Sequence, residues 1–358
     1  MRKISGALKS DIEDAATAEL LANLPVAVAE KDVHITDALV ELANIKIFHD
    51  AYRVNRRKGD ASPGKRVVES RLVFAGGTCL SKAQGLIERM SEDIDIKVIL
   101  DDIPDGYALA QGHTNRKRLG DIQKEVFKKL KDIGFSLAEV EDESNPISRD
   151  NRRYYRLALK YQPEFIDVAG VLRSELKVEL IHRSPRLPVE TIEMGYLLDR
   201  FVKRDSAPRF SMLCISVAET LAEKVLSLLR RCAWKWDGCQ RGEFDSALVR
   251  HIYDVWRIHT SSPKAINAAH PIFADIVATD VDEFGVQHPE FAKAPYRVLR
   301  RALERATSDK GLRENFEQRL IPLLFAKEKP KFETCFESFS ALAEIFLGKG
   351  CDQAVPAS

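Results

Sequence analysis

Two aspartates separated by a single isoleucine constrain the fold of this chain more than any other feature. Asp93 and Asp95 open the segment DIDIKVIL, in which acidic and apolar residues alternate before the run becomes apolar. This alternation predicts a β-strand, in which residues two positions apart project to the same face. Both carboxylates then share one face, while Ile94 and Ile96 point to a core and fix the register of the strand.

Two carboxylates on one strand face repel one another and are costly to desolvate. A hard divalent cation such as Mg²⁺ offsets both effects, since it accepts carboxylates together with the phosphate oxygens of a substrate. The alternative is an edge strand whose polar residues face solvent. Taken alone, the D-x-D spacing favours that alternative, because the pattern is common.

A glycine turn precedes the acids and changes this balance. The run SRLVFAGG (70–77) predicts a strand that ends in a tight turn, and TCLSKAQGLIERM (78–90) has helical spacing. Backbone N–H groups at Gly76, Gly77 and Thr78 can therefore face an anion, and the Thr78 hydroxyl adds a donor. A phosphate cradle beside an acid pair is the arrangement that phosphoryl transfer needs.

The pattern over the whole chain predicts an α+β fold with two sub-domains, because 358 residues exceed one small core. A small mixed sheet with helices on one side, preceded by N-terminal helices, is expected in residues 1–188. A helical domain is expected in residues 189–350, followed by a polar tail, 351–358. The expected strands are 70–77, 92–100, 153–163 and 175–184, and the main expected helices are 27–52, 118–135, 214–231 and 243–259. The basic run 53–66 contains Gly, Ser and Pro and is expected to be an exposed loop.

Charge, hydropathy and cysteines narrow the protein's class. Lys and Arg number 55 against 54 Asp and Glu, so the net charge of +1 does not indicate non-specific coating of duplex DNA. The N-terminus does not resemble a signal peptide, and no run approaches the roughly 20 apolar residues that cross a bilayer. We therefore expect a cytoplasmic protein with no membrane partner. Its six cysteines lack zinc-ligand spacing and are expected to be free thiols.

The segment GGTCLSKAQGLIERMSEDIDI, about 21 residues, closely resembles the core signature of the AbiEii/AbiGii toxin family, which includes the MenT-like toxins. These are nucleotidyltransferases of the DNA polymerase β-like superfamily, with a motif of the form GGT-x-L … R-x-S-x-D-I-D. All fixed positions are present here: Gly76, Gly77, Thr78, Leu80, Arg89, Ser91, Asp93, Ile94 and Asp95.

Weaker resemblances extend from about residue 29 to 258. The segment AEKDVHITDAL (29–39) resembles the family's N-terminal E-K-D helix, and LKVEL (176–180) resembles the strand that bears a third acid, here Glu179. ETLAEKVLSLLRR (219–231) resembles a helix with an essential lysine, here Lys224. HIYDVWRI (251–258) resembles the family's final helix, with Asp254 in place and His251 where an acid is commoner.

The resemblance implies roles for these residues, and each has a structural alternative. Glu179 would act as general base or complete the metal site, or it is a surface acid. Lys224 would reach nucleotide phosphates, or it is a solvated helical lysine. Asp254 would orient Lys224 or the base, or it pairs with Arg250 or Arg257 along its own helix.

Two residues just before the acid pair have alternatives as well. Arg89 would contact the triphosphate, or it bonds to a helix end. Ser91 would line the metal loop, form a local hydrogen bond or be a site of modification. Aromatic and basic residues also interleave at 149–156 and 230–241. This mixture is equally consistent with contact with RNA ends and with packing of Tyr155 and Trp234 in the core.

Residues 1–188 are therefore expected to be a nucleotidyltransferase catalytic domain, with Lys224 and Asp254 contributed by the helical domain. Mg²⁺, expected as two ions and replaceable by Mn²⁺, would be held by Asp93, Asp95 and Glu179. The turn at 76–78 would bind the NTP phosphates, with Arg89, Ser91 and Lys224 completing the nucleotide site.

The family implies transfer of NMP from an NTP to the 3′ end of tRNA, with release of pyrophosphate. The protein would then be the toxin of a bacterial toxin–antitoxin or abortive-infection system, a form of phage defence that blocks translation. A separately encoded antitoxin is the expected partner. A protein hydroxyl or a small molecule is the alternative acceptor, and a catalytically silent nucleotide-binding module is the alternative outside enzymes.

Overall fold

The structure is a computed structural model of the chain. It describes residues 1–54, 64–110, 114–139, 144–168, 170, 172–204, 209–240 and 244–348. The predicted tail at 351–358 and most of the predicted basic loop at 53–66 lie outside the described residues.

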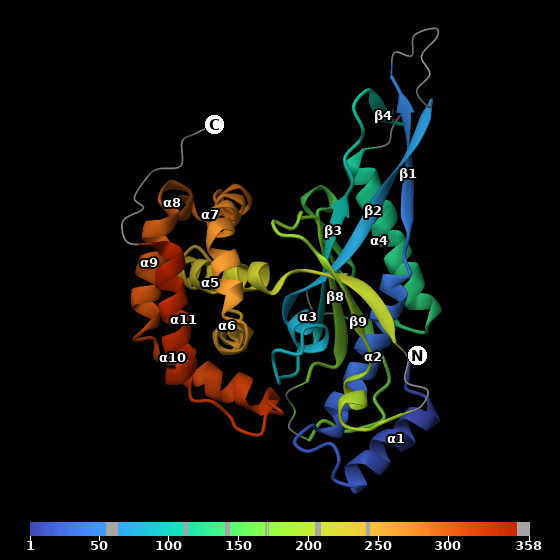
Figure 1. Ribbon diagram of the computed structural model, residues 1–358, viewed down its shortest axis with the longest axis vertical. Helices are drawn as coiled ribbons and strands as arrows, with labels where there is room; N and C mark the ends of the chain where they lie inside the picture. The colour runs from blue at the N-terminus through green and yellow to red at the C-terminus, as the bar shows by residue number, and fades with distance from the viewer. Residues whose placement is uncertain are drawn as a thin grey trace. The chain divides into compact units, whose positions relative to one another are not determined.

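The chain divides into two compact units, each of which is built from segments that are not contiguous in sequence. The sheet unit comprises Met1–Ala83 and Ser91–Ile215, and the helical unit comprises Gln84–Met90 and Ser216–Ser358. The fold is α+β, as the sequence predicts, with a mixed sheet followed by helices (Figure 1). The functional domains 1–188 and 189–350 stay predictions.

The first two helices belong to the sheet unit. Helix α1 (Gly6–Thr17) begins where the Ser5 side chain accepts a hydrogen bond from a backbone N–H of the first turn. Helix α2 (Val26–Ala43) begins after Pro25, which cannot continue a preceding helix. The helix expected to continue to residue 52 ends at Asn44 instead, and IFHDAYR forms strand β1 (Ile47–Arg53).

A ten-stranded mixed sheet forms the core of this unit within the described part of the chain, with the main order β4-β1-β2-β3-β8-β7-β5. Strand β3 runs antiparallel to β2 and parallel to β8. Strand β10 pairs with β2 and β9, and β6 pairs with β7. The remaining strands are β2 (Lys65–Ala75), β3 (Asp93–Leu100), β4 (Tyr107–Leu109), β5 (Ser136–Leu137), β6 (Ile147–Arg149), β7 (Tyr154–Lys160), β8 (Glu175–Ile181), β9 (Glu190–Met194) and β10 (Phe210–Cys214).

The two faces of the central strands differ in polarity. On β3, Ile94 and Ile96 are buried, whereas Asp93 and Asp95 are partly exposed. On β8 the same alternation buries Val178 and leaves its neighbours partly exposed. The apolar face packs into the core, and it fixes the register that places the acids together on the other face. Helix α4 (Asn115–Asp132), which matches the helix expected at 118–135, contacts α2.

Helix α3 (Gly76–Lys82) is shorter than the helix expected at 78–90. The chain leaves helical geometry near Gly85, whose φ is +64°. Residues Gln84–Met90 then belong to the helical unit, where Met90 N–H donates to the Leu323 carbonyl at 2.9 Å and Phe325 N–H donates to the Glu88 carbonyl at 3.0 Å. Tertiary pairing therefore overrides the local helical pattern.

The helical unit begins with α5 (Val217–Trp236), which the Ser216 side chain caps. The helices expected at 214–231 and 243–259 correspond to α5 and α6 (Arg250–Ser261). Helical structure was expected from about Pro188, but strands β9 and β10 occupy that region. The other helices of this unit are α7 (Lys264–Phe284), α8 (Pro289–Lys293), α9 (Pro295–Ala306), α10 (Lys310–Asn315) and α11 (Phe332–Leu347).

Short helical turns complete the described structure, and none of its helices is long and apolar enough to cross a membrane. The short turns are η1 (Asp150–Arg152), η2 (Leu197–Arg200), η3 (Ser246–Val249), η4 (Phe316–Leu320) and η5 (Ile321–Leu323).

Candidate active site

The register of β3 and β8 brings three acids to one face of the sheet. Asp95 lies directly opposite Glu179, and Asp93 lies directly opposite Lys177. Side chains of directly paired residues project to the same face, so Glu179 stands beside the D-x-D pair. The three carboxylates predicted for the metal site therefore share one surface of the sheet unit.

The glycine turn lies against the second aspartate. Gly76 has a φ of +74°, and a Cβ added there would come within 1.9 Å of Asp95 Oδ2. Only glycine allows the carboxylate to approach the turn so closely. Thr78 Oγ1 donates a hydrogen bond to the carbonyl oxygen of Asp93, so this hydroxyl fastens the turn to β3. Gly77 and Thr78 are buried.

Basic side chains of the chain itself neutralise two of the three acids. Arg173 Nη1 lies 2.8 Å from Asp93 Oδ1, and Lys177 Nζ lies 2.6 Å from Glu179 Oε1. Tyr154 on β7 donates to the same Glu179 oxygen at 3.1 Å. Burial alone would lower the pKa of Lys177, but Asp93 and Glu179 together raise it above its ordinary value. Lys177 is therefore a permanent cation at neutral pH.

The donor chemistry of this face fits a hard divalent cation. All three predicted ligands are carboxylates, and the close packing of Gly76 on Asp95 leaves that carboxylate at the mouth of the turn. Among the described residues, no three acidic, His or Cys side chains already converge as a metal cluster. Instead, the negative charge of the face is balanced by Arg173 and Lys177.

A buried ion pair that the sequence prediction missed lies directly behind the acids. Lys31 on α2 lies 2.8 Å from Glu92 Oε2, and both side chains are almost completely buried. Lys31 also donates to the carbonyl oxygens of Arg173 and Glu175, at the start of β8. The signal was present in the sequence, because Glu30, Lys31 and Asp32 interrupt a helix that is otherwise buried on most sides.

In the helical unit, Asp254 on α6 binds two cations at once. Arg89 Nε and Nη2 each donate to one of its carboxylate oxygens at 2.7 Å, and Lys224 Nζ lies 2.7 Å from Oδ2. Burial alone would raise the pKa of Asp254, but Arg89 and Lys224 hold it well below its ordinary value. Of the alternatives weighed for Asp254, the structure shows the contact with Lys224, whereas Arg257 pairs with Glu88 at 3.3 Å.

His251 lies near this triad and is neutral at pH 7. Burial lowers its pKa well below 6.5, and the charge of Lys224 lowers it further. Its Nδ1 atom is buried and has no hydrogen-bond partner among the described atoms. His251 therefore adds no charge to the neighbourhood of Lys224 at neutral pH.

The other predicted residues separate between the two units. Ser91 lies in the sheet unit, partly buried, whereas Arg89 lies in the helical unit two positions earlier. Tyr155 is buried in the sheet core, and burial raises its pKa to about 12. Trp234 is partly buried, with its indole nitrogen enclosed.

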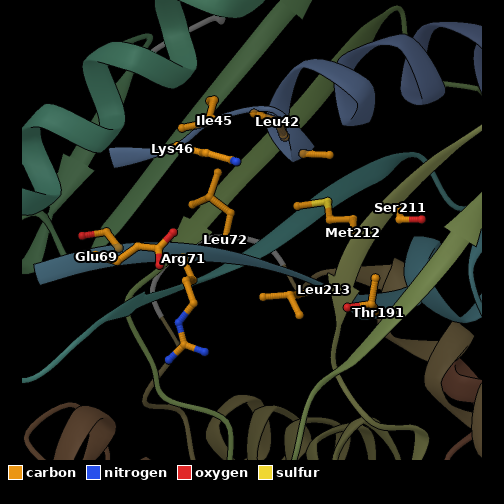
Figure 2. A pocket seen from close by; sticks show the side chains of 12 residues that line it. Leu42, Ile45, Lys46, Glu69, Arg71, Leu72, Thr191, Ser211, Met212 and Leu213 are labelled. Atoms are coloured by element: carbon orange, nitrogen blue, oxygen red, sulfur yellow. The ribbon is translucent and has the colours of Figure 1, made fainter. Parts of the chain in front are cut away.

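A pocket of the sheet unit contains none of the predicted site residues. It opens between the end of α2, the middle of β2, and strands β9 and β10 (Figure 2). Figure 2 shows Arg71 and Leu72 leaving β2 on opposite sides, as neighbouring strand residues do. The part of β2 that lines the pocket is residues 69–72, which precede the glycine turn. Because none of the predicted site residues line this pocket, we place the candidate active site at the acids instead.

Comparison with known proteins identifies the family. A family model described as "Nucleotidyl transferase AbiEii toxin, Type IV TA system" matches residues 65–338, which include the glycine turn, the three acids and the Asp254 triad. The chain belongs to this AbiEii family. Membership makes it a nucleotidyltransferase toxin of a type IV toxin–antitoxin family, as the motif predicted, and it implies an NTP substrate and an antitoxin partner.

Among solved structures, five chains match. One is MenT4, a nucleotidyltransferase toxin from Mycobacterium tuberculosis H37Rv, with 18% sequence identity and a TM-score of 0.41. The match covers 77% of this chain and 72% of the MenT4 chain. No curated protein matches the chain.

Proposed function

We propose that this AbiEii-family protein transfers NMP from an NTP to the 3′ end of tRNA, releases pyrophosphate and so blocks translation in the bacterial cytoplasm. The observation that carries the proposal is the placement of Asp93, Asp95 and Glu179 on one sheet face, with Asp95 packed on the Gly76 turn. Phosphoryl transfer needs this combination of positioning and charge neutralisation.

All three acids have a metal-binding role in this proposal, and Glu179 has a second role as general base. Asp93, Asp95 and Glu179 would hold Mg²⁺, which supplies charge neutralisation of the triphosphate and of the departing pyrophosphate. Glu179 Oε1 accepts a hydrogen bond from Tyr154 and forms an ion pair with Lys177. Its other oxygen is the candidate to accept the proton of the attacking acceptor hydroxyl.

The basic residues of the helical unit also divide into two roles. Arg89 binds Asp254 through Nε and Nη2 and donates from Nη1 to the Met90 carbonyl oxygen at 2.9 Å, so we assign Arg89 to anchoring that carboxylate. Lys224 carries three N–H donors on its ammonium group, and an ion pair with Asp254 leaves donors for a nucleotide phosphate. We therefore keep Lys224 as the phosphate ligand and Asp254 as its positioning residue.

A label-transfer assay tests the proposal. The purified protein is incubated with total RNA, total protein and each of the four α-labelled NTPs in turn, with Mg²⁺. We expect label at the 3′ end of tRNA, and a loss of about 10²-fold or more in Asp93→Asn and Asp95→Asn, because transition-state charge stabilisation is typically worth that much. Asp101→Asn, directly after the same strand, is the matched control and should keep full activity.

Other outcomes would overturn parts of the proposal. Label in protein or in a small molecule, with unlabelled RNA, would replace the tRNA acceptor. Growth inhibition that survives both aspartate substitutions, with no label transferred at all, would replace the enzyme with a silent nucleotide-binding module.

A further inference from the structure

The ion pair between Arg173 and Asp93 occupies an oxygen that the proposed metal site needs. Arg173 Nη1 lies 2.8 Å from Asp93 Oδ1, and the two side chains are 34% and 26% exposed. An ordinary pair with this exposure contributes little, because solvent screens it and two flexible side chains must be ordered. The surroundings of Arg173 show that this pair is not ordinary.

Both backbone polar groups of Arg173 are bound by the buried Lys31–Glu92 pair. The Arg173 N–H donates to Glu92 Oε2 at 2.6 Å, and Lys31 donates to the Arg173 carbonyl oxygen. Lys31 and Glu92 are themselves 0% and 1% exposed. Lys31 contacts Glu92 Oε2 and the carbonyl oxygens of Arg173 and Glu175, so this buried pair holds one geometry and the base of the Arg173 side chain is fixed beside Asp93.

The same buried pair connects the two strands that carry the acids. Glu92 directly precedes Asp93 on β3, and Lys31 also donates to the Glu175 carbonyl at 3.2 Å, at the first residue of β8. Arg173 stands two residues before β8. The same contacts between α2, β3 and the start of β8 therefore position the Arg173 guanidinium beside Asp93 and hold Asp93 and Glu179 on one face.

We propose that Arg173 is a positioning residue that competes with the divalent cation for Asp93 until an NTP binds. The proposal rests on the proposed nucleotidyltransferase function and deepens it. In the nucleotide-free protein the guanidinium neutralises Asp93. The phosphate oxygens of a bound NTP would supply further ligands to the cation and an alternative partner to Arg173. Asp93 would then bind the cation, and the Arg173 guanidinium would bind a phosphate.

The chemistry of each partner supports this exchange. A guanidinium binds carboxylate and phosphate through the same planar pair of donors, so it can exchange one for the other. A hard cation such as Mg²⁺ is held by one or two carboxylates together with substrate phosphates, so its affinity for the protein alone is low. Firm cation binding then requires nucleotide. In the absence of nucleotide, Arg173 balances the charge of Asp93.

Mn²⁺ titration followed by electron paramagnetic resonance tests the proposal in the full-length protein. Without nucleotide, Arg173→Ala should bind Mn²⁺ about tenfold more tightly than the wild type, because a charged hydrogen bond of this kind no longer competes. Arg173→Lys keeps the charge and should remain close to the wild type. With a non-hydrolysable NTP analogue, the wild type should gain more Mn²⁺ affinity than Arg173→Ala does.

The matched control is Arg71→Ala. Arg71 on β2 lies 2.9 Å from Asp101 at a similar exposure, but that pair is not part of the acid group, so Mn²⁺ binding should not change. Loss of folding is not expected in Arg173→Ala, since the contacts of Lys31 and Glu92 with the backbone of residue 173 are kept in the variant. Thermal unfolding of each variant checks this.

Asp93→Asn separates failure of the inference from failure of the proposed function. Equal Mn²⁺ affinity in the wild type and Arg173→Ala, with binding lost in Asp93→Asn, would overturn the role of Arg173 and leave the metal site standing. Mn²⁺ binding that is unchanged by Asp93→Asn in both backgrounds would overturn the metal site, and the role of Arg173 with it.

Discussion

Gly76 shows how much a single residue of the turn contributes to the acid group. We expect Gly76→Ala to lose most nucleotidyl transfer, because the added Cβ would displace the Asp95 carboxylate from which it would lie 1.9 Å. A positive φ also costs a non-glycine residue about 1–2 kcal/mol of stability. Gly106→Ala is the matched control, with a φ of +78° and open space at its Cβ.

Both variants should lose similar stability in urea unfolding, but only Gly76→Ala should lose activity. Equal activity in the two variants would show that Asp95 does not need its place on the turn.

His251 predicts a pH dependence of stability. Its pKa is lowered in the folded protein, so below 6.5 the unfolded chain binds a proton that the folded chain does not. Acid therefore favours unfolding, and the stability difference grows by up to about 1.4 kcal/mol for each pH unit below 6.5. Between pH 7.5 and 5.5, His251→Gln should lose about that much less stability than the wild type.

Urea unfolding at the two pH values measures this difference. His270→Gln, at an exposed position of α7, is the control and should follow the wild type. If the free energy of unfolding of His251→Gln fell between the two pH values as much as that of the wild type, His251 would not be the group that titrates.

At the level of elements, sequence periodicity predicted the strands that carry the acids but not the contacts that fix them. Strand β8 alternates throughout between buried and partly exposed residues, and β3 does so over its first four residues, so a period of two is visible in the sequence. The Lys31–Glu92 and Arg173–Asp93 pairs join residues 61 and 80 positions apart, which no local pattern reports. Strand β1 lies within the helix predicted at 27–52, because Ile45 and Ile47 continue the apolar stripe of α2 at mostly helical spacing.

The Lys31–Glu92 pair is expected to hold α2, β3 and β8 together. Lys31→Met leaves the Glu92 carboxylate buried without its cation, which typically costs about 3–5 kcal/mol of unfolding free energy. The double variant Lys31→Met/Glu92→Gln removes the stranded charge and should recover part of that loss. Activity should stay low in both, because the Arg173 carbonyl oxygen loses the Lys31 donor.

Lys9→Met is the control for this prediction. Lys9 pairs with Glu164 at 3.0 Å on the protein surface, so its loss should leave the urea midpoint almost unchanged. Similar losses in Lys31→Met and Lys9→Met would show that burial does not make the Lys31 pair special.

At the level of the whole molecule, a continuous sequence motif is divided between two compact units. Gly76–Ala83 and the acids belong to the sheet unit, whereas Gln84–Met90 belongs to the helical unit. The motif was recognisable from its spacing, but its division was not, because it depends on pairing of Glu88 and Met90 with residues more than 230 positions later. Arg89 consequently belongs to the helical unit, where it binds Asp254.

This division predicts a local effect of Arg89→Met. Loss of the two hydrogen bonds to the buried Asp254 should cost about 3 kcal/mol, although Lys224 still balances that charge. Hydrogen exchange followed by mass spectrometry should then rise in residues 84–90, in α6 and around Leu323, because these segments bind one another within the helical unit. Exchange in β3 should stay at the wild-type level, since its amides pair with β2 and β8.

Arg257→Met provides the comparison for this last effect. Arg257 also connects α6 to the 84–90 segment, through the Leu86 carbonyl at 2.9 Å and Glu88 at 3.3 Å, but its side chain is partly exposed. Its loss should raise exchange in the same segments by less, because water replaces the lost partners. If β3 exchanged as fast as α6 in Arg89→Met, the acid strand would depend on the helical unit for its stability, and the two units would unfold as one.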